Sequence, residues 1–203
     1  MISTFYTDTC KSVLSAYFLA VTVLKAQAID ASIPKQKSAL LATALSKTAS
    51  IFALFGGQGI NEVYFDKLQN LYDIYKLFVA PFIQTLTEDV LVPLAAEEEA
   101  ATHYEFGLDV VSWLLDAAAR PAVPYLTSVP ILSPLIGLTQ LVQYWVVCPI
   151  ANLTPGELRS RISGATGHSQ GIMSAVVIAA SGTFKEFADN SRKCCNLLIK
   201  ILP

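Results

Sequence analysis

The motif Gly167-His168-Ser169-Gln170-Gly171 has the residue types and spacing that suit covalent chemistry. A serine on a tight strand-to-helix turn projects its hydroxyl clear of the backbone and can attack an acyl group. Glycine is needed two positions to either side, because a Cβ there would collide within the strained turn. The helix that follows directs free N–H groups at the place where an oxyanion would develop. The motif therefore predicts a nucleophilic serine at position 169.

A second glycine-rich turn, Gly56-Gly57-Gln58-Gly59, directly follows the apolar run 51–55. Such a turn at the end of a strand lets the backbone approach a ligand closely and exposes amide donors. Taken alone, it is best interpreted as an ordinary tight turn. In combination with the serine motif, it predicts that two turns at the carboxyl ends of parallel strands face one crevice, where α/β proteins bind their ligands.

The elements that must position these turns are indicated by the apolar pattern of the chain. The run 51–55 is typical of a buried parallel strand, and a short strand is expected near 161–166. Four prolines between 121 and 134 predict a loop. Helices are expected at residues 12–28, 37–46, 64–85, 106–118, 135–147, 170–180 and 184–201. The alternation predicts an α/β fold with parallel strands, and the aromatic residues of 64–85 are interpreted as core packing.

The composition excludes several classes of protein. The 203 residues are 53% hydrophobic and 15% charged, with a net charge of −2. So apolar a chain has ample surface to bury and is not disordered. Its length allows one domain with a flanking helical segment. The slightly negative charge argues against a nucleic-acid partner and against binding to an anionic membrane surface.

Two apolar segments raise the alternative of a membrane protein or a secreted one. Val13–Leu24 resembles the apolar region of a signal peptide, although Asp8 precedes it. Residues 121–156 carry no charge, and Ile131–Ile150 is long enough to cross a hydrocarbon core of ~30 Å. This second segment also holds prolines and glutamines, which are costly where water cannot reach them. We expect both segments to be helices of a soluble protein, with no membrane partner.

The metal-binding residue types are few and badly spaced. The four cysteines show no C-x-x-C pattern, and the two histidines are His103 and His168. We therefore expect no metal site and expect the cysteines to be small, reduced, mostly buried groups. The cysteines are Cys10, Cys148, Cys194 and Cys195.

Three stretches of the sequence, 51–59, 125–141 and 154–171, resemble the acetyl- and malonyl-transferase superfamily of fatty acid and polyketide synthases. They are most similar to the acetyltransferase region of the fungal type I fatty acid synthase β-subunit, and they occur in that family's order. The resemblance covers nearly the whole chain. It implies a partial acyltransferase core with a hydrolase-like serine elbow, in which residues 1–50 form an N-terminal helical segment and residues 51–203 the first part of the acyltransferase domain.

The resemblance also implies roles for the residues of the two motifs. Ser169 would take an acetyl group from coenzyme A and pass it to the phosphopantetheine arm of an acyl carrier protein. The backbone amides of Gln58 and Gln170 would form the oxyanion hole, while the glycines allow the turns. The rest of a synthase β-subunit and its α-subunit would be partners in a cytoplasmic complex for fatty acid biosynthesis. Acetyl-CoA would be a substrate, and no bound cofactor is implied. The turn glycines are Gly56, Gly57, Gly59, Gly167 and Gly171.

One catalytic group implied by the resemblance is absent from the sequence. The family's catalytic histidine lies far beyond the serine, after a ferredoxin-like subdomain, whereas no residue from 170 to 203 is histidine. His103 is expected on the surface and Arg192 in a scaffold helix, so neither is expected to be a base or a carboxylate clamp. We therefore expect the chain alone to lack the ferredoxin-like subdomain and to be weak or inactive.

Three interpretations of function remain open on the sequence. The first is the acetyltransferase region of a fatty acid synthase, which the sequence of residues 154–159 and 134–137 favours. The second is the starter-unit acyl carrier protein transacylase region of a fungal polyketide synthase. The third is a fragment without catalysis, because the histidine is absent.

Overall fold

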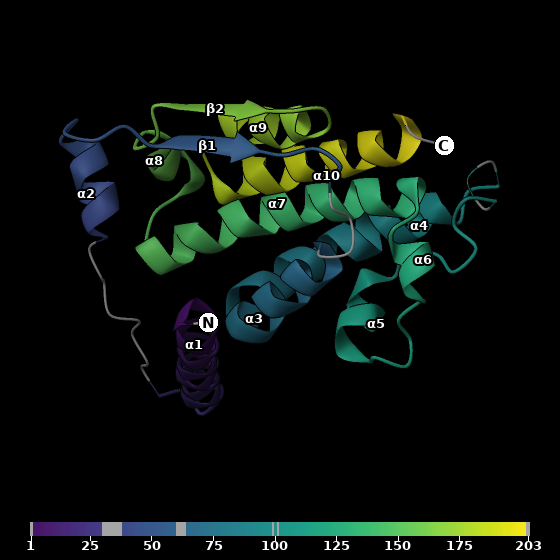
Figure 1. Cartoon of the computed structure of the whole chain (residues 1–203), viewed down its shortest axis with the longest axis horizontal. Helices are drawn as coiled ribbons and strands as arrows, with labels where there is room; N and C mark the ends of the chain where they lie inside the picture. The colour runs from purple at the N-terminus through teal and green to yellow at the C-terminus, as the bar shows by residue number, and fades with distance from the viewer. Residues whose placement is uncertain (1, 30–37, 60–63, 99, 101, 202–203) are drawn as a thin grey trace.

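The computed structural model describes residues 2–29, 38–59, 64–98, 100 and 102–201, which form a mostly helical protein with one small sheet (Figure 1). The sheet consists of β1 (Phe52–Phe55) and β2 (Gly164–Gly167), which pair in parallel with Phe52 opposite Gly164 and Phe55 opposite Gly167. The predicted parallel strands are thus confirmed, although within the described residues the α/β character is limited to this pair.

The helices begin and end close to most of the expected positions. The N-terminal pair is α1 (Ile2–Ala26) and α2 (Ala39–Leu45), and the middle of the chain holds α3 (Tyr64–Leu86), the π-helix η2 (Thr87–Leu91) and α4 (Val92–Ala95). Two short helices, α5 (Val110–Leu115) and α6 (Val123–Leu126), precede the long α7 (Val129–Ala151). The last third contains α8 (Pro155–Arg159), α9 (Gly171–Ala180) and α10 (Phe184–Ile201).

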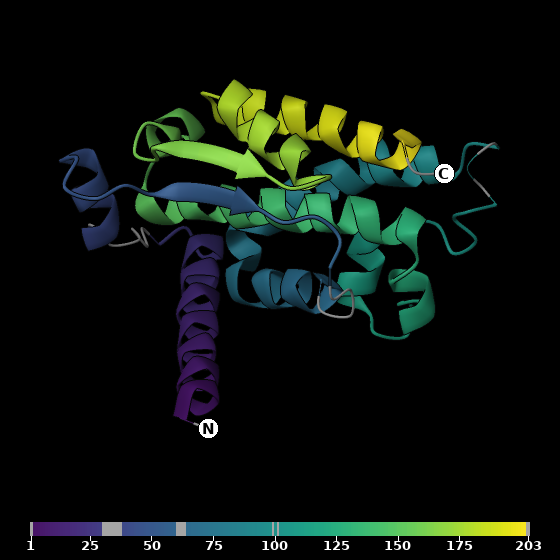
Figure 2. The same ribbon diagram turned by 45° about the horizontal axis from the view of Figure 1, so that its top comes forward.

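Helix α7 is the centre of the protein, with α3 on one side and α9 and α10 on the other (Figures 1 and 2). Every residue from 131 to 142 is buried. Aromatic rings join the neighbouring helices: Trp145 stacks on Phe82 of α3 with 4.4 Å between ring centroids, and Tyr144 stacks on Phe187 of α10 at 5.5 Å. The absence of charge around residues 131–142 is therefore explained by their place in the core of the protein.

The beginning of α7 differs from the sequence-based prediction of a loop followed by a helix at 135. The helix starts at Val129, and both Pro130 and Pro134 lie inside it. Proline is tolerated in a first helical turn, but Pro134 has no N–H to donate to the carbonyl of Pro130. The hydroxyl of Tyr104 donates to that carbonyl instead, at 3.3 Å. A tertiary hydrogen bond thus replaces the missing helical one.

Two further sequence-based expectations are wrong. The helix expected at 106–118 is limited to α5, because Gly107 adopts φ +65° and Asp109 caps the helix by accepting from the amide of Ser112 at 3.0 Å. Strand β1 is parallel but not buried, since Phe52 is 60% and Leu54 73% exposed. Helix α9 packs against the two strands, and the opposite face carries these two side chains outward.

Helix α1 stands away from the rest of the protein in Figure 2 and meets it along α3. Phe18 and Val21 are buried there, and the Phe18 ring lies against Tyr75 and Phe78 of α3, both at 5.4 Å between centroids. Among the described residues, two helical stretches are long and apolar enough to cross a membrane, Tyr64–Ala95 and α7. Their apolar windows are 44% and 83% buried inside the protein, respectively.

Candidate functional site

Ser169 lies at a sharp turn between β2 and α9. Its backbone adopts φ +54°, a left-handed conformation that is uncommon for a residue with a side chain. The turn is closed by two hydrogen bonds, from the amide of Gly171 to the carbonyl of His168 at 3.0 Å and from the amide of Ile172 to the carbonyl of Ser169 at 3.1 Å. The side chain of Ser169 is exposed. This is the strand–turn–helix context in which a serine elbow presents its hydroxyl.

The two glycines of the serine motif are required by crowding. A Cβ on Gly167 would overlap the backbone of Gly171 and the amide of Ile172. A Cβ on Gly171 would overlap the carbonyl of Phe55, and the carbonyl of Gly56 lies 2.7 Å from the same position. Helix α9 therefore begins directly against the end of β1, which only glycine permits.

The glycine-rich turn after β1 touches the serine elbow. The amide of His168 donates to the carbonyl of Phe55 at 2.9 Å, which extends the pairing of the two strands by one residue. The chain then passes the serine, so that a Cβ on Gly57 would lie 2.8 Å from the Cβ of Ser169 and 3.0 Å from the carbonyl oxygen of His168. The structure therefore brings together the two turns that sequence spacing singled out.

Two backbone amides at this junction have no partner within the described part of the chain. One is the amide of Gln58, which follows the buried Gly57, and the other is the amide of Gln170, the N-cap residue of α9. A helix leaves its first amides unpaired, and the helix dipole places partial positive charge at that end. Two N–H groups without a partner, close to a serine, are suited to stabilising the oxyanion of acyl transfer.

Three buried polar side chains, two on α7 and one on α9, form hydrogen bonds that hold these turns in place. The amide of the Gln140 side chain donates to the carbonyl of Gly56 at 2.7 Å, and its oxygen accepts from the hydroxyl of Ser174 at 2.7 Å. The hydroxyl of Ser133 donates to the side-chain oxygen of Gln170 at 2.9 Å. The glycine-rich turn and the serine elbow are thus both tied to α7.

Sequence reasoning did not assign a role to these three residues. The signal that could have found Ser133 and Gln140 is the spacing of polar residues within the apolar helix α7. Ser133 and Gln140 are seven positions apart, which places them on one helical face two turns from each other. A buried polar residue in a hydrophobic helix must find a hydrogen-bond partner, and here that partner is the site.

Neither histidine of the sequence forms a hydrogen bond with Ser169 within the described structure. His168 lies on the turn itself, and its Nδ1 is 3.4 Å from the place of a Cβ on Gly57. His103 is exposed in the turn region after α4. Arg192 binds Asp89 of η2 at 3.0 Å and Asp189 at 2.9 Å, so it belongs to the scaffold as expected. The site therefore has an exposed serine and two amides without a partner among the described residues, with neither histidine hydrogen-bonded to the serine.

The described residues contain no cluster of His, Cys, Asp or Glu that could hold a metal ion. All four cysteines are free: Cys10 is exposed and the others are buried. Burial raises the pKa of the Cys148 and Cys194 thiols to about 12 and raises that of Cys195 further. These three buried thiols are protonated at neutral pH, which makes them poor nucleophiles.

Comparison with known proteins identifies relatives across most of the chain. A family described as "SAT: Starter unit:ACP transacylase in aflatoxin biosynthesis" matches residues 53–201. The chain is 42% identical over 168 residues to the fatty acid synthase beta subunit aflB of Emericella nidulans and 44% identical over 164 residues to the fatty acid synthase subunit beta of Schizosaccharomyces pombe. The corresponding protein of Saccharomyces cerevisiae is 39% identical over 171 residues.

These matches cover 83%, 81% and 82% of this chain, respectively. In each case the chain spans about 8% of the length of the relative it matches. The similarity therefore applies to one region of much larger proteins.

Proposed function

The chain belongs to the starter unit:ACP transacylase family and is similar to one region of fungal fatty acid synthase β-subunits, and from this premise we propose that Ser169 is its acyl-carrying nucleophile. The observation that carries the proposal is the contact of the two turns, with the left-handed Ser169 beside the free amides of Gln58 and Gln170. A serine in this setting can form an ester whose tetrahedral precursor is stabilised by two N–H donors.

The proposed reaction transfers an acetyl group in two steps. In the first, the Ser169 oxygen bonds to the thioester carbon of acetyl-CoA, the carbon–sulfur bond breaks, and the serine proton leaves with coenzyme A as its thiol. In the second, the thiol of a phosphopantetheine arm on an acyl carrier protein takes the acetyl group and returns its proton to the serine. Gln58 and Gln170 hold the carbonyl oxygen in both steps.

The missing base sets the expected rate. Loss of the base in a serine enzyme costs about 10⁶ in kcat, while the oxyanion hole and binding retain about 10³ to 10⁴ over water. We therefore propose that the 203-residue chain acylates slowly by itself. The third interpretation, a fragment without physiological catalysis, is supported by the same observation that neither of the two histidines is hydrogen-bonded to Ser169 in the described structure.

The pathway, partners and location are part of the proposal. The three relatives named above are all fatty acid synthase β-subunits, which favours fatty acid biosynthesis, whereas the description of the matching family supports the polyketide alternative. An acyl carrier protein and the other parts of a β- and α-subunit complex would be the partners. The free buried cysteines suit the reducing cytoplasm.

The division of the chain into a helical segment, residues 1–50, and an acyltransferase part, residues 51–203, is also proposed. It is supported by the extent of the family match, which begins at residue 53. It is supported as well by α2, none of whose residues is buried.

The test is the acetylation of the purified chain by radiolabelled acetyl-CoA, followed by intact-mass analysis and peptide mapping. We expect one acetyl group to accumulate slowly on Ser169, and none in Ser169→Ala. Acetylation that is equal in the two proteins would overturn the nucleophile. Rapid, stoichiometric acetylation of Ser169 would instead show that the chain does not need a further base.

A further inference from the structure

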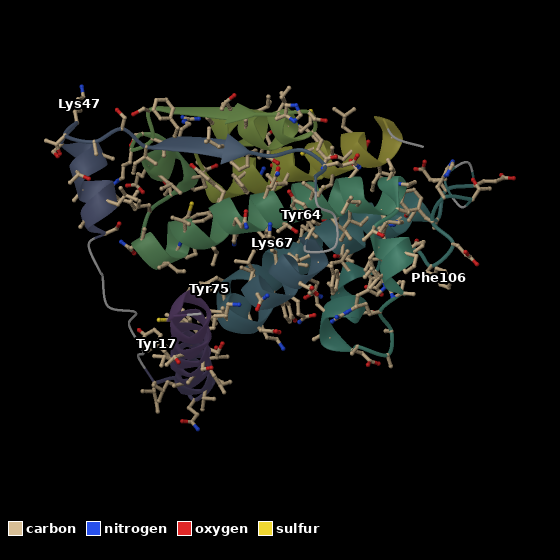
Figure 3. The ribbon with its side chains drawn as sticks, in the orientation of Figure 1. Tyr17, Lys47, Tyr64, Lys67, Tyr75 and Phe106 are labelled. Atoms are coloured by element: carbon tan, nitrogen blue, oxygen red, sulfur yellow. The ribbon has the colours of Figure 1, made fainter. Side chains whose placement is uncertain are left out.

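Tyr64 and Lys67, on the first turn of α3, form a cation–aromatic pair next to the proposed site (Figure 3). The Tyr64 hydroxyl donates to the carbonyl of Gly57 at 3.5 Å, and its oxygen lies 3.9 Å from the place of a Cβ on Gly56. The Nζ of Lys67 lies 4.8 Å from the centre of the Tyr64 ring. The ammonium group is therefore linked to the serine elbow by two contacts in series, through Tyr64 and then Gly57.

The charge of Lys67 is available to an external anion. Its side chain is exposed and has no carboxylate within ion-pair distance among the described residues. On a helix, a side chain faces the residues three and four positions away. Toward the C-terminus of α3, these neighbours of Lys67 are Asn70 and Leu71, which carry no charge. Asp66 is adjacent in sequence and so points along a different direction of the helix. Tyr64 holds the lysine in place without neutralising it.

We propose that Lys67, positioned by the Tyr64 ring, binds a phosphate group of the pantetheine-bearing substrate whose thioester reaches Ser169. The proposal rests on the proposed acyl transfer. A phosphopantetheine chain has a thiol at one end and a phosphate at the other, so a site that holds the acyl carbon at the serine is served by a cation at some distance along the chain. An exposed lysine is suited to this, because it binds phosphate as a point charge and tolerates different phosphate geometries.

Two ligands share this chemistry, and the test separates them. Coenzyme A carries a pyrophosphate and a 3′-phosphate beyond the pantetheine, 4′-phosphopantetheine carries one phosphate, and pantetheine carries none. Equilibrium binding of each to the whole chain would be measured by titration calorimetry at low and high salt, in wild type, Lys67→Ala and Lys67→Arg. Recognition of the carrier protein's arm requires an effect on phosphopantetheine, whereas recognition of the nucleotide part affects coenzyme A alone.

The chain offers a matched control on the same helix. The Nζ of Lys76 lies 5.3 Å from the centre of the Tyr72 ring, so Lys76→Ala removes the same kind of pair farther along α3. An exposed charge pair is worth about 0.2–1 kcal/mol, so we expect Lys67→Ala to weaken the binding of the phosphate-bearing ligand about 1.4-fold to fivefold. We expect no change for pantetheine or in Lys76→Ala, rescue by Lys67→Arg, and loss of the difference at 1 M salt.

Several outcomes would overturn the inference. These are unchanged binding of both phosphate ligands in Lys67→Ala, an equal loss for pantetheine, an equal loss in Lys76→Ala, or no binding of coenzyme A by wild type. Its failure is distinguishable from failure of the proposed function. If Ser169 is acetylated but Lys67→Ala binds normally, the function stands and the inference fails. If Ser169 is never acetylated but binding depends on Lys67, phosphate recognition stands without the acyl transfer.

Discussion

Substitution of Gly57 by alanine tests whether the contact between the two turns shapes the site. The added Cβ would lie 2.8 Å from the Cβ of Ser169 and 3.0 Å from the carbonyl of His168. Neither neighbour is the end of a flexible side chain, so the backbone of the elbow must move. Ordinary contact begins at 3.4 Å, which requires a displacement of about 0.6 Å.

The size of the effect follows from that displacement. Overpacking of this kind costs about 1–3 kcal/mol, which corresponds to a decrease in Tm of about 2–12 °C for a chain of this length. A misplacement of about 1 Å costs about 100-fold in rate, so we expect acetylation of Ser169 to fall about 10- to 100-fold. Melting would be followed by circular dichroism, and the initial rate of acetylation by intact mass.

Gly59 provides the control, because no atom lies within 4 Å of a Cβ built on it. Gly59→Ala should leave the rate unchanged and the free energy of unfolding within about 0.5 kcal/mol, or slightly higher because alanine restricts the unfolded chain. The reasoning is refuted if Gly57→Ala keeps the wild-type melt and rate, or if Gly59→Ala loses as much as Gly57→Ala.

Three further predictions concern the strain, the support and the pH dependence of the protein. Ser169→Gly should unfold at a Tm about 2–4 °C above that of Ser169→Ala, because glycine relieves about 1 kcal/mol of left-handed strain at φ +54°; equal melts would contradict the strain. Gln140→Leu should lower the free energy of unfolding in urea by about 1–3 kcal/mol, because it leaves the carbonyl of Gly56 unpaired. Gln143→Leu, on the exposed face of α7, should change that free energy little. Similar losses in the two variants would contradict a stabilising role for the hydrogen bond from Gln140 to Gly56. Burial raises the pKa of Cys148 to about 12, so the folded protein keeps the thiol proton at a pH where the unfolded chain, with a thiol pKa of about 8.5, loses it. The free energy of unfolding in urea should therefore fall as pH rises from about 8.5 to 10, and it should fall less steeply in Cys148→Ala. Equal slopes in the two proteins would contradict this.

The serine turn could be predicted from the sequence because much of what it requires is local. A Cβ on Gly167 would overlap Gly171 and Ile172, only a few residues away, whereas Gly171 is crowded by the distant carbonyls of Phe55 and Gly56, so the local motif indicates this glycine without giving the reason for it. Helices α9 and α10 likewise begin within two residues of the expected positions, because their apolar periodicity and their polar boundaries agree.

The start of α7 could not be predicted, because it depends on a residue far away in the sequence. Pro130 and Pro134 indicate a break by local rules. The hydroxyl of Tyr104 satisfies the carbonyl that Pro134 leaves free, and the helix continues. The prediction that β1 is buried is wrong for a related reason. An apolar run gives no information on how many faces of its sheet are covered.

The contacts that hold the turn of the proposed nucleophile come from the buried side of the site. Gln140 and Ser133 tie the two turns to α7, in which every residue from 131 to 142 is buried, and the glycines fix the spacing between the strands and α9. The outward face of the sheet, with Phe52 and Leu54 exposed, contributes nothing to this support.

The geometry of Ser169 and its two amide donors is therefore set independently of any base. A general base acts on the proton of the serine, whereas the donors act on the oxygen of the acyl group, so the two contributions to the rate are physically separate. Acetylation of the 203-residue chain, compared with that of Ser169→Ala and Gly57→Ala, would measure the contribution of the preorganised elbow with neither histidine hydrogen-bonded to the nucleophile. We expect the packing of α7 against the two turns to preserve that contribution, because a displacement of the hydroxyl by about 1 Å would cost about 100-fold in rate.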